Sequence, residues 1–128
     1  MNEKILLDAS AYIAYISKEP GFEKVEKVIN CACINMVTYT EIISFYARKG
    51  LSLDLLKQLC SYVEILKIDE EVSFKAGYMI KESKEYGLSM GDRFCLATSQ
   101  KEKCKVYTAD KVWLNLKDKL GIDIISIR

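Results

Sequence analysis

Short apolar runs that alternate with helix-like segments are the feature of this 128-residue chain that most restricts its fold. Each run is short enough for a buried strand, and most are followed by apolar residues at helical spacing. Strands that alternate with helices need crossover connections, which produce a parallel sheet covered on both faces. The sequence therefore predicts a three-layer α/β/α fold with a central, mostly parallel sheet of about five strands. The strands we expect are residues 4–8, 31–37, 63–68, 105–108 and 122–127.

The segments between these runs carry residues that begin or end helices. Ser52 and Ser89 are good N-caps, whereas Gly50 and Gly87 stand where helices should stop. The first helix should follow Asp8 and run to about Ile16, and a second should begin near Pro20. The other helices we expect begin at Thr38, Ser52, Asp69, Ser89 and Asp110, with the one from Asp69 continuing to about Tyr86 and the one from Asp110 to Leu120.

Composition limits the chemistry that such a fold can perform. Residues 1–128 have the length of one domain, and no apolar stretch is long enough to span a membrane, so we expect a single cytoplasmic domain without a membrane partner. The odd number of cysteines is typical of reduced thiols rather than a disulfide framework. The chain contains no histidine, which excludes Ser-His-Asp and Cys-His catalysis. Hydrolytic chemistry would have to use carboxylates, lysine, tyrosine, hydroxyls or a metal.

Four acidic residues stand at the ends of expected strands or the beginnings of expected helices. They are Asp8, Glu41, Asp92 and Asp110. In an open α/β sheet these boundaries gather at one edge, outside the carboxyl ends of the strands. Carboxylates brought together there repel one another unless a cation lies between them. A hard divalent ion such as Mg²⁺ or Mn²⁺ is the natural candidate.

Each acid also has an ordinary structural explanation. Asp8 and Asp110 could be plain N-caps, and Thr38-x-x-Glu41 and Ser89-x-x-Asp92 both match the capping-box pattern. Caps need not point toward a common place, so the convergence of four acids favours a site. The hydroxyls of Ser10 and Thr108 could orient a carboxylate or a metal-bound water, or could simply cap the backbone.

Four segments together resemble a known family. They are Leu7 to Ala11, Thr40 to Ile42, Leu88 to Arg93 and Tyr107 to Lys111. Their order and spacing resemble the PIN-domain ribonucleases, and most closely the VapC-type toxins of prokaryotic toxin–antitoxin pairs. The resemblance implies a PIN-like fold, an acidic site made by Asp8, Glu41, Asp92 and Asp110, one or two Mg²⁺ or Mn²⁺ ions, and an RNA substrate. It also implies a homodimer and a cognate antitoxin.

Our hypothesis from these observations is a divalent-metal-dependent endoribonuclease that hydrolyses RNA phosphodiester bonds. Asp8 and Asp92 are the expected direct metal ligands. Asp110 could bind the metal directly or through water, and Glu41 could bind metal or position the attacking water. The residues expected to contact flanking RNA phosphates are Arg93, Arg48, Lys49 and Lys111. Arg93 could instead pair with an acid, and for the other three the sequence slightly favours a solvated surface position.

Other readings of the same residues stay open. A catalytically inactive PIN-like module could bind RNA or a protein partner without a metal. A phospho-acceptor receiver domain would need adjacent acids after the first strand, where this chain has only Asp8, and a phosphatase with an aspartate nucleophile would need a second aspartate in place of Ser10. Apolar residues such as Phe45, Tyr46 and Leu55 could form a two-fold interface or be buried within one chain.

Overall fold

The computed structural model of the protein describes residues 3–128 and is built on one five-stranded sheet. The strands lie in the order β3-β2-β1-β4-β5, and every neighbouring pair is parallel. The predicted three-layer fold with a parallel sheet is thereby confirmed. The strands are β1 (Ile5–Leu7), β2 (Ala32–Asn35), β3 (Glu64–Leu66), β4 (Lys105–Thr108) and β5 (Ile124–Ser126).

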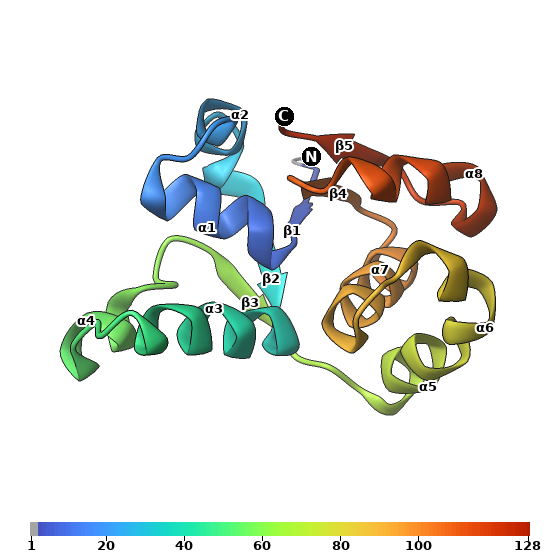
Figure 1. Ribbon diagram of the computed structural model, residues 1–128, viewed down its shortest axis with the longest axis horizontal. Helices are drawn as coiled ribbons and strands as arrows, with labels where there is room; N and C mark the ends of the chain where they lie inside the picture. Colours follow the sequence, from blue (N-terminus) through green and yellow to red (C-terminus); the bar gives the residue numbers. More distant parts are fainter. Residues whose placement is uncertain (1–2) are drawn as a thin grey trace.

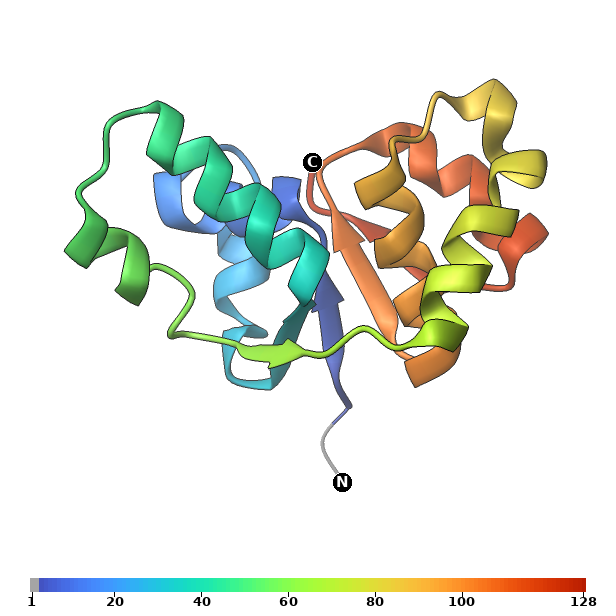
Figure 2. The same cartoon turned by 90° about the horizontal axis from the view of Figure 1, so that it is seen from below.

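Helices cover both faces of the sheet (Figures 1 and 2). One face carries α1 (Ala9–Ser17), α2 (Phe22–Glu26), the 3-10 helix η1 (Ile29–Cys31), α3 (Met36–Arg48) and α4 (Leu53–Gln58). The other carries α5 (Glu70–Tyr78), α6 (Ile80–Ser83), η2 (Lys84–Tyr86), α7 (Met90–Glu102), η3 (Lys111–Leu116) and α8 (Lys117–Leu120). Among residues 3–128, no helix is both long and apolar enough to cross a membrane.

The alternation of side chains along β1 divides the core into two layers. Ile5 and Leu7 pack with α1 and α3, whereas Leu6 packs with α5 and α7 on the opposite face. Successive side chains of a strand point to opposite faces, so a strand buried on both sides must be continuously apolar. Burial of each of these side chains contributes roughly 2 kcal/mol before conformational entropy is counted. The short apolar run is therefore what places β1 at the centre of the sheet.

The order of the strands reverses between β1 and β4, where the chain passes from one half of the sheet to the other. The connections that leave β1 and β2 cross on the α1–α4 face, whereas the connections around β4 lie on the α5–α8 face. A crevice forms outside the carboxyl ends of strands at such a switch point, and ligands of open α/β sheets bind there. Asp8 follows β1 and Asp110 follows β4, so both acids lie at this crevice.

Three of the predicted helices differ from those in the structure, and one of them, predicted from Asp110 to Leu120, is divided into the 3-10 helix η3 and the short α8. The prediction that α3 begins at Thr38 is wrong, because the Asn35 side chain accepts a hydrogen bond from the Thr38 amide and caps a helix that begins at Met36. The predicted continuous helix from Asp69 to Tyr86 is also wrong, because it is divided into α5, α6 and η2. Near the break, the Ser83 hydroxyl donates to the carbonyl of Met79, a contact that often bends helices.

Candidate active site

Asp8 is a buried carboxylate at the end of β1, where it caps α1. Its Oδ1 accepts a 2.8 Å hydrogen bond from the Ala11 amide, and the Ser10 hydroxyl lies 2.7 and 2.9 Å from its two oxygens. Burial raises the pKa of Asp8 to about 6. Hydrogen bonds from Thr108, Ala11 and Ser10 oppose this rise in pKa, and the charge of Asp92 adds to it. The environment therefore disfavours an unaccompanied negative charge at this position.

Two hydroxyls join the ends of β1 and β4 around Asp8. Thr108 is fully buried and donates to Oδ2 of Asp8 at 2.5 Å, while its Oγ1 accepts from the Asp110 amide at 3.0 Å. The Ser10 oxygen accepts from the Ala109 amide at 2.9 Å. Each hydroxyl donates to the carboxylate of Asp8 and also accepts from a backbone amide. Both predicted roles, orienting a carboxylate and capping the backbone, are therefore found together. They hold Asp8 in one orientation relative to β4.

Glu41 reaches the site from the second turn of α3. Its carboxylate is half-buried and has no hydrogen bond or ion pair with any residue in 3–128. Burial raises its pKa, and the charges of Asp92 and Asp8 raise the pKa further. The carboxylate lies against the backbone of Gly91, where an added Cβ would stand 2.3 Å from Oε2 of Glu41. Glu41 is therefore held beside the first turn of α7 without a cation to neutralise it.

Asp92 lies in the first turn of α7 and takes part in the predicted capping box. The Ser89 amide donates to Oδ2 of Asp92 at 3.0 Å, and the Asp92 amide donates to the Ser89 hydroxyl at 3.1 Å. Burial raises the pKa of Asp92, the hydrogen bonds from Ser89 lower it, and the charge of Asp110 raises it. Asp92 is thus both a cap and a member of a group of like charges.

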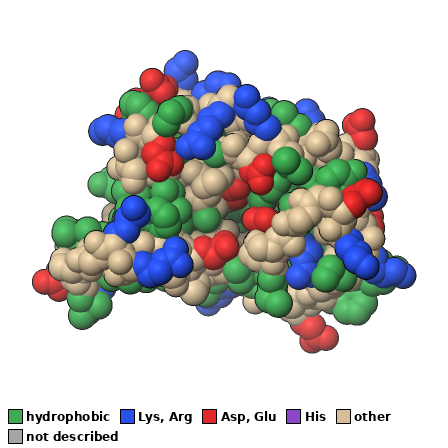
Figure 3. All heavy atoms as spheres, in the orientation of Figure 1, with side chains coloured by type: hydrophobic (Ala, Val, Ile, Leu, Met, Phe, Trp, Pro, Cys, Tyr) green, Lys and Arg blue, Asp and Glu red, His purple; other side chains and the backbone are tan. Residues whose placement is uncertain are grey.

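Asp110, an exposed residue two positions beyond the end of β4, completes the group. It caps η3 by accepting a 3.0 Å hydrogen bond from the Val112 amide. The charge of Asp92 raises the pKa of Asp8 and of Glu41, and the charge of Asp110 raises the pKa of Asp92, so Asp92 lies near each of the other three acids. In the space-filling view, acidic side chains occupy the hollow between the two halves of the molecule, with lysine and arginine side chains around it (Figure 3).

The acids provide the donor chemistry of a hard cation, although their side chains do not form a compact cluster. Within residues 3–128, no three Asp, Glu, Cys or His side chains are grouped closely enough to count as a metal cluster. Oxygen-only donors suit Mg²⁺ or Mn²⁺, which need a few carboxylates and retain several waters. The unpaired carboxylate of Glu41, beside Asp92 and coupled to Asp8, fits such an ion because it has no other positive partner among these residues.

Arg93 lies away from the position expected of a phosphate-binding residue. Its side chain is buried, and Nη1 donates a 2.9 Å hydrogen bond to the carbonyl of Ala76 in α5. The expected contact with RNA phosphate and the alternative ion pair with an acid both disagree with this placement. Arg93 instead joins α7 to α5 through this hydrogen bond, which satisfies part of the buried guanidinium, while its Nε has no partner among the described residues.

The other three basic residues are exposed, as contacts to a long anionic ligand require. Arg48 and Glu41 line one hollow of about 410 Å³ along α3, together with Val37, Thr40 and Ser44. Lys49 lies 5.0 Å from the centre of the Phe45 ring at the end of the same helix. Lys111 follows Asp110 directly at the other side of the acids. These placements leave all three available at the rim.

Asn35 is a structurally important residue that the sequence analysis missed. It is fully buried at the end of β2, and its side chain contacts both α3 and α7. An asparagine between an apolar run and a helix is a common N-cap, and this signal could have identified it. The nearby Thr38, which was taken for the cap, has a buried hydroxyl without a hydrogen-bond partner among the described residues.

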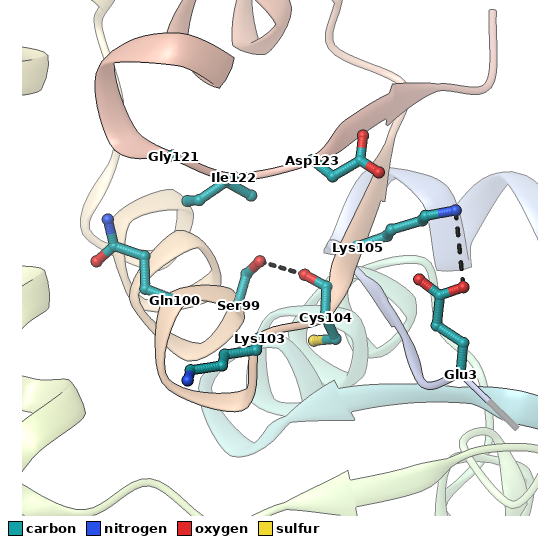
Figure 4. A pocket seen from close by; sticks show the side chains of 9 residues that line it. All are labelled: Glu3, Ser99, Gln100, Lys103, Cys104, Lys105, Gly121, Ile122 and Asp123. Atoms are coloured by element: carbon teal, nitrogen blue, oxygen red, sulfur yellow. Dashed lines mark hydrogen bonds and ion pairs between the residues drawn. The ribbon is translucent and has the colours of Figure 1, made fainter. Parts of the chain in front are cut away.

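A second cavity of about 270 Å³ lies at the opposite end of the sheet, near the beginnings of β1 and β4 (Figure 4). Its polar groups largely satisfy one another. Lys105 pairs with Glu3 at 3.7 Å, and the Ser99 hydroxyl donates to the carbonyl of Cys104 at 2.6 Å. The cavity contains none of the four acids, so it is separate from the candidate active site.

Comparison with known families identifies the chain. The family model described as "PIN domain" matches residues 5–119, which is most of the sequence. The chain belongs to the PIN domain family. In this PIN domain Asp8 and Asp110 follow strands β1 and β4, whereas Glu41 and Asp92 lie on helices α3 and α7. Comparison with curated protein sequences gave no significant match.

Solved structures share the fold of this PIN domain at low sequence identity. A toxin–antitoxin complex from Klebsiella pneumoniae aligns with a TM-score of 0.74 at 17% identity, covering 98% of both chains. DNA-bound VapBC from Salmonella typhimurium gives a TM-score of 0.72 at 22% identity, covering 99% of this chain and 100% of that one. VapC20 of Mycobacterium tuberculosis, described as a sarcin-ricin-loop-cleaving toxin, gives 0.69 at 13% identity, covering 84% and 91%.

Proposed function

We propose that this PIN domain is a divalent-metal-dependent endoribonuclease and the toxin of a toxin–antitoxin pair. The observation that carries the proposal is the position of Glu41, whose carboxylate lies against Gly91 in the first turn of α7, next to Asp92, and has no neutralising partner among the described residues. A repulsive group of this kind is costly unless a cation binds to it. Structural neighbours that include VapBC complexes and an RNA-cleaving toxin support the same assignment.

In the proposed site, Asp8, Asp92 and Asp110 hold one or two Mg²⁺ or Mn²⁺ ions, and Glu41 either binds the metal or orients the attacking water. A bound divalent ion would activate water and offset charge on the phosphate. The chain's own contribution is orientation. Ser10 and Thr108 direct the carboxylate of Asp8, and the Ser89 amide donates to Oδ2 of Asp92, whose Oδ1 makes no hydrogen bond within residues 3–128.

Arg48, Lys49 and Lys111 are the proposed contacts to RNA phosphates on either side of the cleaved bond. Their exposure and the hollow shared by Arg48 and Glu41 support this role. Cationic side chains around an acidic centre allow an anionic strand to cross it. We leave Arg93 out of this set because its guanidinium is buried against α5.

Cleavage of labelled structured RNAs by the purified protein tests the proposed function. Wild-type protein should cut in Mg²⁺ or Mn²⁺ and stop in EDTA, and Asp92→Asn should not cut. Asparagine can still accept the hydrogen bond from the Ser89 amide, so this variant should keep the fold, as circular dichroism would verify. Wild-type cutting by a folded Asp92→Asn variant would reject the metal-site assignment. A wild-type protein that neither binds Mn²⁺ nor cuts RNA would favour an inactive binding module.

An apolar groove between α1 and α4 is the proposed contact surface for an antitoxin. The groove encloses about 350 Å³ and is lined mainly by Ile16, Tyr46, Leu51, Leu55, Leu59 and Tyr62. Leu55 and Tyr62 are more than half exposed, and exposed apolar patches of this kind often mark interfaces. Solved relatives are toxin–antitoxin complexes, which supports a protein partner here. Leu55→Glu should abolish co-purification of the cognate antitoxin with this chain.

A homodimer is the second partner that we propose. The interface expected around Phe45, Tyr46 and Leu55 needs correction, because Tyr46 is buried in the core and Phe45 is half-buried. The exposed aromatic pair of Phe74 and Tyr78 on α5, stacked at 6.2 Å, is a better candidate. Sedimentation should show a dimer that Tyr78→Glu converts to a monomer. A wild-type monomer at high micromolar concentration would reject this proposal.

A further inference from the structure

The side chain of Asn35 forms a bridge between α3 and α7. Its Oδ1 accepts a 2.7 Å hydrogen bond from the Thr38 amide in the first turn of α3. Its Nδ2 donates to the hydroxyl of Thr98 at 2.9 Å and to the carbonyl of Phe94 at 3.2 Å, both in α7. The amide therefore makes three of the four hydrogen bonds that it can form. Its orientation follows from these partners, because the backbone amide needs an acceptor and the carbonyl needs a donor.

The bridge is buried and closed on itself. Asn35 is fully buried, and Thr98 is nearly so. The Thr98 hydroxyl donates to the carbonyl of Phe94 at 2.8 Å, so it can accept from Asn35 at the same time. A buried network in which every member has a partner has one favoured geometry. A plain N-cap needs only the contact to Thr38, and the two contacts to α7 are additional.

Each of the two bridged helices carries one acid of the candidate site. Glu41 lies on α3, and Asp92 lies in the first turn of α7. The helices are in contact, and the Glu41 carboxylate lies against the backbone of Gly91. Both acids are negative, so their repulsion tends to separate the two helix ends. The bridge opposes that separation from a buried position at the end of β2.

We propose that Asn35 is a positioning residue that holds Glu41 and Asp92 at the separation at which both serve one metal-dependent site. This inference rests on the proposed function, which it extends from the acids to the residue that sets their spacing. Asn35 itself faces α3 and α7 rather than the hollow, so it acts through the two helices.

Variants that separate the cap from the bridge test this inference. Asn35→Ser keeps a side-chain oxygen that can cap α3 and removes the donors to α7. Thr98→Val removes the hydroxyl that accepts from Asn35 with little change in volume, so it tests the same bridge if Asn35→Ser fails to fold. Ser52→Ala is the matched control, because it removes an N-cap from α4, away from the acids.

Two measurements read the result. Calorimetry gives the affinity for Mn²⁺, and NMR of the metal-free protein gives the NOE between the Glu41 Hγ and Gly91 Hα protons. Asn35→Ser and Thr98→Val should each weaken the NOE and lower Mn²⁺ affinity about tenfold, within the range for residues that orient metal ligands. The rate constant kcat for RNA cleavage should fall with little change in KM. Ser52→Ala should leave all of these unchanged.

Folded bridge variants with a wild-type NOE and wild-type Mn²⁺ affinity would overturn the inference, and Asn35 would then be a cap alone. A wild-type protein that binds no Mn²⁺ and cuts no RNA would reject the proposed function instead. In that case the NOE, which needs no metal, still shows whether Asn35 holds Glu41 against α7, and its loss in both variants would support that part of the inference.

Discussion

The hydroxyl of Thr108 donates a 2.5 Å hydrogen bond to Oδ2 of Asp8, a residue 100 positions earlier in the chain. This contact joins the ends of the two central strands, and it favours the ionised form of a carboxylate that burial would otherwise keep protonated. A metal ligand has to be ionised, so the hydrogen bond bears directly on when Asp8 can bind a cation.

Replacing Thr108 by valine should therefore move Mn²⁺ binding to higher pH. Loss of the hydrogen bond raises the pKa of Asp8 above its value of about 6, so a larger fraction is protonated at neutral pH. At pH 8 the variant should also lose roughly 1–3 kcal/mol of unfolding free energy. Calorimetric titration with Mn²⁺ at several pH values measures the shift. Thr40→Val, which removes an exposed hydroxyl on α3, is the control, and an unchanged pH midpoint in Thr108→Val would contradict the prediction.

Asp8→Asn should stabilise the metal-free protein at neutral pH. The pKa of Asp8 is about 6 in the folded protein against an ordinary 3.8, so the folded state binds the proton more tightly. The unfolding free energy of the wild type should therefore fall as pH rises from about 4 to 6, and the total loss is at most about 3 kcal/mol. Asparagine does not ionise, so the unfolding free energy of the variant should not show this decrease. Urea unfolding in EDTA at pH 4 and at pH 7.5 measures the unfolding free energy of both proteins. An equal change between the two pH values in wild type and variant would contradict the prediction.

Gly91→Ala should weaken metal binding without destabilising the fold. A methyl group at this position would stand 2.3 Å from Oε2 of Glu41, so the carboxylate would have to move away from α7. Alanine itself favours the helix by up to about 1 kcal/mol. Gly77→Ala in α5 is the matched control, because a Cβ there meets nothing within 4 Å. Thermal unfolding and Mn²⁺ calorimetry should show equal or higher stability in both variants and roughly tenfold weaker binding only in Gly91→Ala.

Loss of Arg48 should weaken RNA binding, whereas loss of Arg93 should lower the stability of the fold. In an Asp92→Asn background, Arg48→Ala should weaken binding of an uncleaved RNA and lower the salt slope by about 1. Arg93→Ala should leave that slope unchanged and lower the unfolding free energy by roughly 1–3 kcal/mol, because it removes the donor to the Ala76 carbonyl. Fluorescence anisotropy at several salt concentrations and urea unfolding measure the two effects. A reduced salt slope in Arg93→Ala would show that this residue contacts phosphate after all.

The sequence predicts the sheet and the positions of the acids well because both depend on local patterns. The apolar run at β1 and the caps at Asp8, Ser89 and Asp110 are each recognisable from a few adjacent residues. The parallel direction then follows from the alternation of strands and helices, so the strand ends, with the acids beside them, are expected at one edge of the sheet, whereas the strand order comes from the structure alone.

The residues that the sequence misplaced depend on contacts between distant segments. Arg93 is buried because α5 presents a carbonyl to it, and Ala76 lies 17 positions away. Asn35 gains its importance from Thr98 in α7, 63 positions away. Neither partner can be recognised from spacing along the chain. The same holds for Tyr46, which is largely buried against α1, where its hydroxyl makes a hydrogen bond with Ser17.

The position of β1 at the centre of the sheet has a consequence during protein synthesis. β1 and Asp8 are translated about a hundred residues before β4. β4 pairs with one edge of β1 and supplies Thr108, and Asp110 follows it. Until β4 has been translated, β1 has an open edge, and the carboxylate of Asp8 lacks its partner. The acids of the proposed ribonuclease can therefore come together on a nascent chain only after β4 and Asp110 have been translated.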